Sequence, residues 1–386
     1  MTEQRREDWD PRSATVLQDQ IRAYDTMRKQ CPVAWSDYQQ WTLFRHADLM
    51  QVLEDHKTFS NAVSVHLSVP NGMDPPEHTP YRRVIEPYFG PEPMARFEPQ
   101  CREVARTLVQ RLPKNEPVNV VEALSRPFAL QIQCAFMGWP ENLHQPLADW
   151  VQKNHQATLA RDRQAMAEVA QEFDGYIRDL LNTRRQAGGQ APNDVTTSLM
   201  REQVNGKPMT DEQLISLLRN WTVGELATIS ASVSILVNYL AQHPALLREL
   251  KAAPDQLPLA IDEILRMDAP LISNRRVTTR DVNVGGKVIS AGEKITILWA
   301  SANRDEEVFG NPDDFCPQKN ADKNLLYGAG VHECPGAPLA RMELKVLMEE
   351  LLKPLEALEM VKEHASERAM FPTGGFNVLP ILFRQI

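Results

Sequence analysis

Residues 223–240, VGELATISASVSILVNYL, contain a single charged side chain, that of Glu225. The segment belongs to a longer proline-free stretch that opens with a capping-box pattern at Thr210 and Gln213 and ends before Pro244. This pattern predicts a helix of roughly 30 residues, on the order of 45 Å long at about 1.5 Å per residue. A helix that is apolar nearly all round is buried at the centre of a large protein, so this segment constrains the fold more than any other.

A membrane span is the main alternative for this helix, since its length is sufficient. We reject it because Glu225, Asn238 and three serines interrupt the apolar run, and ordinary soluble helices flank it. Gly224 costs about 1 kcal/mol of helix stability relative to alanine. It indicates either that something approaches the helix backbone closely or that another helix packs tightly there.

Helical patterning also dominates the rest of the chain, where proline and glycine mark the turns. Strand-like segments are few, and they are 41–44, 282–289, 294–300 and 377–383. No internal repeat, low-complexity tract or linker divides the sequence. We therefore expect a single domain, residues 1–386, that is mainly α with small β-sheets.

Charge and cysteine usage narrow the setting and the partners. The net charge of -9 and the lack of a basic block argue against a nucleic-acid partner. The first residues, MTEQRREDWDP, are charged from the start and predict neither a secretory signal nor a membrane anchor. The five cysteines are odd in number and scattered, which is typical of reduced thiols. We expect a soluble cytoplasmic protein that binds no membrane.

Residues 327–336, YGAGVHECPG, hold three glycines, one histidine and Cys334. No second cysteine lies close enough in the sequence for a zinc cluster or a short disulfide loop. Glycines let a chain turn tightly beneath a flat macrocycle, and backbone amides can then hydrogen-bond the sulfur. A helix beginning after Cys334 would bring its positive N-terminal end near the sulfur and favour the thiolate. A buried structural cysteine would not need these features together.

The longer stretch YGAGVHECPGAPLAR, residues 327–341, resembles the haem-ligand signature of cytochromes P450, aromatic-G-x-G-x-H-x-C-x-G followed by x-x-L-A-R. Every fixed position is met, with Tyr327 where phenylalanine is commoner. The resemblance implies the cytochrome P450 fold, in which a long central helix lies over haem b and the Cys334 loop lies beneath it. It implies that Cys334 binds the iron, with His332 among the cofactor-binding residues. A thiolate ligand favours cleavage of the O–O bond.

The same resemblance assigns a contact with a haem propionate. DPPEHTPYRR, residues 74–83, looks like the family's helix that crosses the haem edge, with His78 and Arg82 four residues apart on one face. These two side chains would hold a propionate, as suits a cation beside a carboxylate. A solvated helix face is the alternative for both.

Two further segments match the family in the expected order. NRRVTTRDVNVGG, residues 274–286, resembles the strand that supplies another propionate-binding arginine. The register nominates Arg276, and Arg275 is the alternative. EILR matches the family's E-x-x-R pattern, which implies that Glu263 and Arg266 form a structural ion pair rather than a catalytic one.

On the oxygen side of the haem, the family usually carries an acid followed by threonine in the central helix. Counting back from Pro244 places Thr228 at the threonine position and Ala227 where the acid is expected. Dioxygen must receive two protons before its O–O bond breaks, and alanine supplies neither. Thr228 can donate a hydrogen bond there, and Glu225, one turn earlier, can replace the acid through a water chain. The alternatives are a core threonine and a carboxylate that pairs with a neighbouring helix or caps a structural water.

A narrower resemblance rests on NWTVGEL, MGWP and SNRRVTTR, at residues 220–226, 137–140 and 273–280. These are similar to haem domains of bacterial P450s fused to their own reductase, and to a stand-alone relative implicated in thiocarbamate breakdown. The chain has no flavin or iron–sulfur motif, so we expect a free-standing enzyme or a haem domain cut from a fusion. Electrons would then come from a ferredoxin-type donor with an NAD(P)H-dependent reductase.

Segments 62–73, 271–274 and 374–377 are expected to roof and wall a substrate pocket. They are aliphatic, small or neutral, with no Arg or Lys in the roof, which suits an uncharged apolar ligand. We interpret the chain as a haem-thiolate monooxygenase that hydroxylates or O-dealkylates a small apolar substrate, aromatic or alkoxy-aromatic. A peroxygenase driven by hydrogen peroxide is the alternative, because Ala227 weakens the proton supply. A haem-based sensor without turnover is a third, and it would need no oxygen-side threonine.

Overall fold

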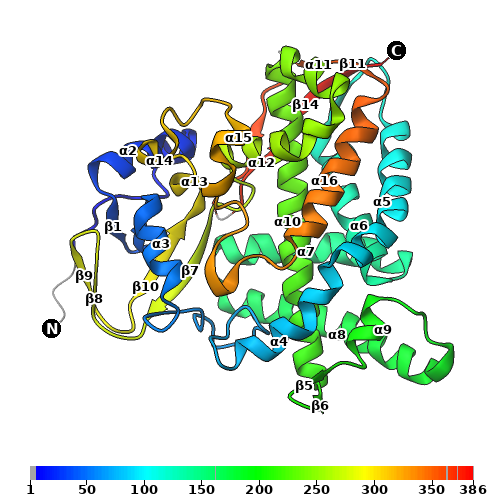
Figure 1. Ribbon diagram of the computed structural model, residues 1–386, viewed down its shortest axis with the longest axis horizontal. Helices are drawn as coiled ribbons and strands as arrows, with labels where there is room; N and C mark the ends of the chain where they lie inside the picture. Colours follow the sequence, from blue (N-terminus) through cyan, green and yellow to red (C-terminus); the bar gives the residue numbers. More distant parts are fainter. Residues whose placement is uncertain (1–5, 161, 362–363, 372, 386) are drawn as a thin grey trace.

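The computed structural model describes residues 6–160, 162–361, 364–371 and 373–385. Helices fill one side of the molecule and a small mixed sheet forms the other (Figure 1). The prediction of a mainly α fold with small sheets is therefore confirmed.

The predicted central helix is α10, Asp211–Gln242. The capping box is present: the Gln213 N–H donates to Thr210 Oγ1 over 3.3 Å, and the Thr210 N–H donates to Gln213 Oε1 over 2.9 Å. By length and apolar composition this helix passes as a membrane span, but 61% of its most apolar window is buried inside the protein. It is the core helix that its sequence predicts (Figure 1).

Other helices surround α10. Those packed against it include α6 (Arg126–Met137), α7 (His144–Ala160), α8 (Arg163–Ala187), α11 (Pro244–Ala252), α12 (Leu257–Met267) and α16 (Ala337–Leu352). The long helix α5 (Pro91–Arg111) lies along α16. The shorter helices are α1 (Ala14–Gln18), α2 (Gln20–Gln30), α3 (His46–Glu54), α4 (His78–Ile85), α9 (Val195–Leu199), α13 (Trp299–Ala302), α14 (Glu306–Phe309) and α15 (Pro317–Asn320). Of these, α2, α3, α13 and α14 lie on the side of the sheet (Figure 1).

A five-stranded sheet has the strand order β1 (Val33–Ser36), β2 (Gln40–Leu43), β10 (Lys294–Leu298), β7 (Ser273–Thr278) and β3 (Phe59–Ser60). Only β2 and β10 run parallel; the other neighbours are antiparallel. The predicted strand at 294–300 is two residues too long, because α13 starts at Trp299. The predicted segment 282–289 is the hairpin of β8 (Val282–Val284) and β9 (Lys287–Ile289).

The predicted C-terminal strand is two strands, β13 (Phe376–Val378) and β14 (Pro380–Gln385). They separate at Leu379, whose N–H donates to Asn119 Oδ1 instead of continuing one ladder. The remaining strands are β4 (Pro117–Asn119) and β11 (Leu355–Met360), which flank β14, β12 (Glu367–Arg368), which pairs with β13, and the hairpin of β5 (Gln203–Val204) and β6 (Lys207–Pro208).

The expected ion pair of the E-x-x-R pattern fastens α12 to the chain that leads to Cys334. Arg266 donates to both Glu263 oxygens over 2.8 and 3.0 Å, and both side chains are fully buried. Glu263 also accepts from the Cys316 N–H, and Arg266 donates to the Asn303 carbonyl. The pair thus holds the segment before the cysteine loop against the helical core.

Candidate active site

The loop that carries Cys334 needs glycine at two positions. Gly328 and Gly330 adopt φ angles of +76° and +72°, which L side chains rarely take. At Gly330 a Cβ would also lie 2.5 Å from the Leu53 carbonyl oxygen of α3. The Cys334 N–H donates to the Tyr327 carbonyl over 2.8 Å and closes the loop.

The Cys334 thiol lies just before the N-terminus of α16 and is open to a cavity. Burial by the surrounding protein raises the pKa of the thiol. The backbone N–H groups of Gly336 and Ala337 donate to the sulfur and act in the opposite direction. Together with the helix N-terminus, these donors prepare a site for a thiolate that faces the cavity.

The cavity has a volume of about 1570 Å³ and extends between α10 and the Cys334 loop. Pockets for drug-sized ligands occupy roughly 300–1,000 Å³, so this one has room for a large cofactor and a second molecule. Gly224, Thr228 and Cys334 all line it. A Cβ added at Gly224 would meet no atom within 4 Å, so the alternative of tight helix packing at this glycine is wrong.

A cluster of cationic and imidazole side chains lies at one wall, which Arg82, Arg276 and His332 line, with His78 buried against His332. It brings together His78 from α4, Arg276 from β7 and His332 from the cysteine loop, with Arg82 one turn after His78. The imidazole rings of His78 and His332 lie 4.4 Å apart, and neither Nε2 atom makes a hydrogen bond to the described residues; the nearest carboxylate to His332 Nε2 is Asp74 Oδ1, 3.9 Å away. Burial lowers the pKa of both rings, that of His332 to about 3.

Arg276 is the more buried of the two candidate arginines on β7, with 7% of the residue exposed, and Arg275 is half-buried. Its Nη1 donates to the Arg275 carbonyl over 2.8 Å. The negative charge of Asp74 favours the ionised form of Arg276. Arg82 donates to the Glu333 carbonyl over 2.8 Å and pairs with Glu86. The solvated helix face, the alternative for His78, is wrong, because that ring is 3% exposed.

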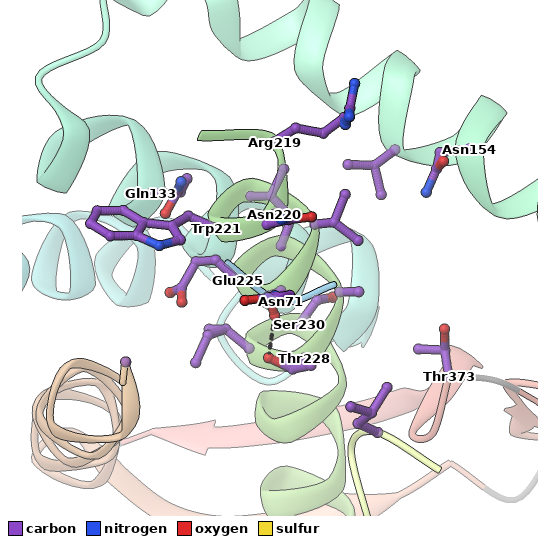
Figure 2. Close-up of a pocket in the computed structure, with 18 of the residues that line it drawn as sticks. Asn71, Gln133, Asn154, Arg219, Asn220, Trp221, Glu225, Thr228, Ser230 and Thr373 are labelled. Atoms are coloured by element: carbon purple, nitrogen blue, oxygen red, sulfur yellow. Dashed lines mark hydrogen bonds between the residues drawn. The ribbon is translucent and has the colours of Figure 1, made fainter. Parts of the chain in front are cut away.

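The side chains on the distal part of α10 separate into two directions. Thr228 faces the cavity, and its hydroxyl donates to the Gly224 carbonyl over 2.6 Å (Figure 2). Glu225, which also borders the cavity, extends from another side of the helix, toward α16 (Figure 2). Its carboxyl group faces that of Glu343 on α16, so the two predicted oxygen-side residues are near in sequence but differ in their surroundings.

The roof of the cavity follows the prediction in part. Residues between Asn61 and Gly72 line it, as do Leu271, Asn274, Gly374, Phe376 and Asn377 in the walls. Arg219 of α10 also borders the cavity, so the expected lack of an arginine near the roof is wrong. Its Nη1 donates to Asp174 Oδ1 over 2.9 Å, and Nη2 donates to the Leu67 carbonyl over 3.3 Å. The arginine holds the roof and is neutralised there.

Sequence reasoning missed two sets of residues. One comprises polar side chains from helices that carry no chemical motif, including Gln133 of α6, Asn154 of α7 and Asn220 of α10 (Figure 2). The other is Glu343, which is fully buried. A signal for it exists, because Glu343 lies on the apolar stripe of α16 between Leu339 and Leu347, where a carboxylate is not expected.

Comparison with known proteins assigns the class. Residues 71–377 match the cytochrome P450 family, so the chain belongs to it and is a haem-dependent monooxygenase. Linalool 8-monooxygenase of Pseudomonas putida is 29% identical over 92% of this chain and 94% of its own. Erythromycin C-12 hydroxylase of Saccharopolyspora erythraea is 31% identical over 85% of each chain. The structure of open cytochrome P450 EryK from S. erythraea superimposes with a TM-score of 0.85 at 28% identity, covering 94% of this chain and 95% of its own, which confirms the cytochrome P450 fold.

The residues of the cavity fit a haem. The buried Nε2 atoms of His78 and His332 make no hydrogen bond to the described residues, and the Arg276 guanidinium is buried beside them. A propionate carboxylate would supply the acceptors that these groups lack. The Cys334 sulfur faces the same cavity from a helix N-terminus. When bound, the haem supplies the iron at which dioxygen is activated.

Proposed function

We propose that this protein is a single-domain haem b monooxygenase that hydroxylates or O-dealkylates a small, neutral and apolar substrate, aromatic or alkoxy-aromatic. Electrons come from a ferredoxin-type donor and its NAD(P)H-dependent reductase, in the cytoplasm. The reaction consumes RH, O₂, two electrons and two protons and gives ROH and water. Hydroxylation beside an ether oxygen gives a hemiacetal, whose collapse releases an aldehyde and the dealkylated alcohol.

The observation that carries the neutral-substrate proposal is the pairing of Arg219 with Asp174. A free guanidinium at the roof would favour a carboxylate substrate, whereas an arginine already bound to an aspartate does not. Asn220 is similarly engaged, because its Nδ2 donates to the Val69 carbonyl over 3.0 Å. Relatives of similar identity are named for substrates as different as linalool and erythromycin, so family membership does not choose the substrate.

Each residue of the site has a separate role in this proposal. Cys334 binds the iron, and the cluster of four side chains holds the propionates, namely His78, Arg82, Arg276 and His332. The Thr228 hydroxyl can release the Gly224 carbonyl and donate to dioxygen as it is reduced. Glu225 supplies protons near the Thr228 hydroxyl. The cavity excludes bulk water from this step.

A peroxygenase is the second candidate, and Ala227 favours it. Hydrogen peroxide brings both the electrons and the protons, so that RH and H₂O₂ give ROH and water without an acid beside Thr228. A threonine that hydrogen-bonds its own helix is compatible with either oxidant.

The first test is an optical titration of the ferric protein with an alkoxybenzene and with the matching alkoxybenzoate. A neutral ligand that displaces water from the iron shifts the haem to high spin. We expect the shift with the alkoxybenzene and not with the alkoxybenzoate; preference for the anion would refute the neutral-substrate proposal. Turnover of a binding compound with electron donor, and then with peroxide in its place, separates the two enzymes. If no product forms with the electron donor or with peroxide, the haem-based sensor is the remaining interpretation.

A further inference from the structure

Two carboxyl groups meet inside the protein at the contact between α10 and α16. Glu225 Oε1 and both oxygens of Glu343 are buried and accept no hydrogen bond from any N–H or O–H group of the described residues. None of the ion pairs in the described chain includes either side chain. The two carboxyl groups lie close enough for one to donate to the other when it is protonated.

Physical chemistry requires a proton at this contact. Two carboxylates that touch in a low-dielectric interior cannot both be ionised, and neither has a cation to offset its charge. Burial raises the pKa of both groups, and the charge of Glu225 raises that of Glu343 further. The other titratable groups affected by these carboxylates are the Cys101 thiol of α5 and the Cys334 thiol, and neither supplies a positive charge.

We propose that Glu225 and Glu343 share one proton, and that this pair is the acid that delivers protons to the oxygen side of the pocket in place of the acid missing at Ala227. The inference rests on the proposed oxygen-activating function and gives its site a proton source. Glu225 borders the cavity one turn before Thr228, whereas Glu343 lies behind the cavity wall. Glu225 is thus the donor, and Glu343 is a positioning residue that keeps the shared proton bound at neutral pH.

The transfer step is balanced without any further reactant. The shared proton, which the charge of Glu225 favours on Glu343, crosses to Glu225. The Glu225 O–H bond then breaks, and an O–H bond forms on an oxygen atom derived from O₂, directly or through the Thr228 hydroxyl. The negative charge left on the pair makes it a strong base, so it takes a proton back from water before the next transfer. The two electrons of the reaction come from the external donor of the proposed function.

Infrared difference spectroscopy of the ferric holoenzyme, in H₂O and in D₂O, tests the shared proton without any substrate. The wild-type protein should show the C=O stretch of a buried carboxylic acid, shifted in D₂O. Both Glu225→Gln and Glu343→Gln should lose this band, because an amide donates to the remaining carboxylate and lets it ionise. Glu212→Gln, an exposed position on α10, should keep it. A band that survives in Glu343→Gln, or is missing from the wild type, overturns the sharing of a proton.

Turnover with the electron donor, on a compound that shifts the haem spin state, tests whether the pair delivers protons. Each single variant should lower the rate of product formation on the order of 10²-fold, the lower end of what a positioned general acid contributes, while electrons are diverted to hydrogen peroxide. The double variant should be no slower than the singles, because the residues act as one unit. Additive losses, or full rates with the band lost, would make the pair a structural contact. Failure of every substrate to turn over would instead strike the proposed function, since the infrared result stands apart from it.

Discussion

Replacing Arg276 with methionine should accelerate haem loss and, in the haem-free protein, should relieve an electrostatic cost. The guanidinium is 7% exposed, and burial lowers its pKa from 12.5 to about 10, against the opposing charge of Asp74. That fall corresponds to roughly 3 kcal/mol at about 1.36 kcal/mol per pKa unit. An arginine remains charged at pH 7 in the folded and the unfolded chain, so the full cost of burial is present there.

A bound haem reverses the sign of the substitution. A propionate beside Arg276 offsets the buried charge, and removing one member of a buried pair costs about 3–5 kcal/mol. Methionine fills much of the same volume but leaves the propionate without this donor. Because about 1.4 kcal/mol is a factor of ten, haem loss should rise on the order of 10²-fold or more.

The assay is transfer of haem from the ferric protein to an excess of apomyoglobin at pH 7, followed by absorbance. Unfolding of the haem-free protein in guanidinium chloride measures the opposite effect. Arg275→Met is the matched control, because Arg275 also borders the cavity but is only half-buried. If Arg275→Met lost haem faster than Arg276→Met, the other register would be correct. Unchanged haem loss in Arg276→Met would refute the role of its charge.

Three further substitutions test other parts of the structure. Glu263→Ala should lower the free energy of unfolding by about 3–5 kcal/mol, because it leaves the fully buried Arg266 without its partner. Glu359→Ala, in an exposed ion pair, should cost less than about 1 kcal/mol. Denaturant titration measures both, and equal costs would contradict the reasoning. Gly330→Ala should abolish the absorbance signature of a thiolate-bound haem with CO, while far-ultraviolet circular dichroism is retained. The reason is that φ at residue 330 is +72° and a Cβ there would lie 2.5 Å from a carbonyl oxygen. A normal signature would show that the loop can shift. Asp174→Asn should free Arg219 and improve alkoxybenzoate binding, relative to the alkoxybenzene, by about 1 kcal/mol or roughly fivefold in spin-state titrations; an unchanged ratio would exclude the pairing as a determinant of charge selectivity.

Several elements of the fold could be predicted because their signals are local. The capping box at Thr210 and Gln213 and the unbroken apolar run specify α10 within one residue at its start, and the next proline ends it. Segment 282–289 is predicted only as strand-like; Gly285 and Gly286, both with positive φ, turn it into the β8–β9 hairpin. The C-terminal strand was predicted as one piece because nothing in its sequence shows that Leu379 bonds to Asn119, 260 residues away.

The cysteine loop, and through it the family, is likewise determined by the sequence. Positive φ angles and a close carbonyl require its glycines, and the helix that begins at Ala337 places its N-terminus beside the cysteine. All of these features lie in one continuous stretch of chain. The surroundings of Glu225, unlike the cysteine loop, are not determined by one segment of the sequence. Position i−3 from Thr228 indicates a shared face of α10, but only the packing of α16 brings Glu343 against that carboxyl group. The same holds for Arg219 and Asp174, which lie on two helices. Sequence determines what is written in one segment, whereas the tertiary structure decides which charges meet, because the free energy of a buried charge depends on its partner.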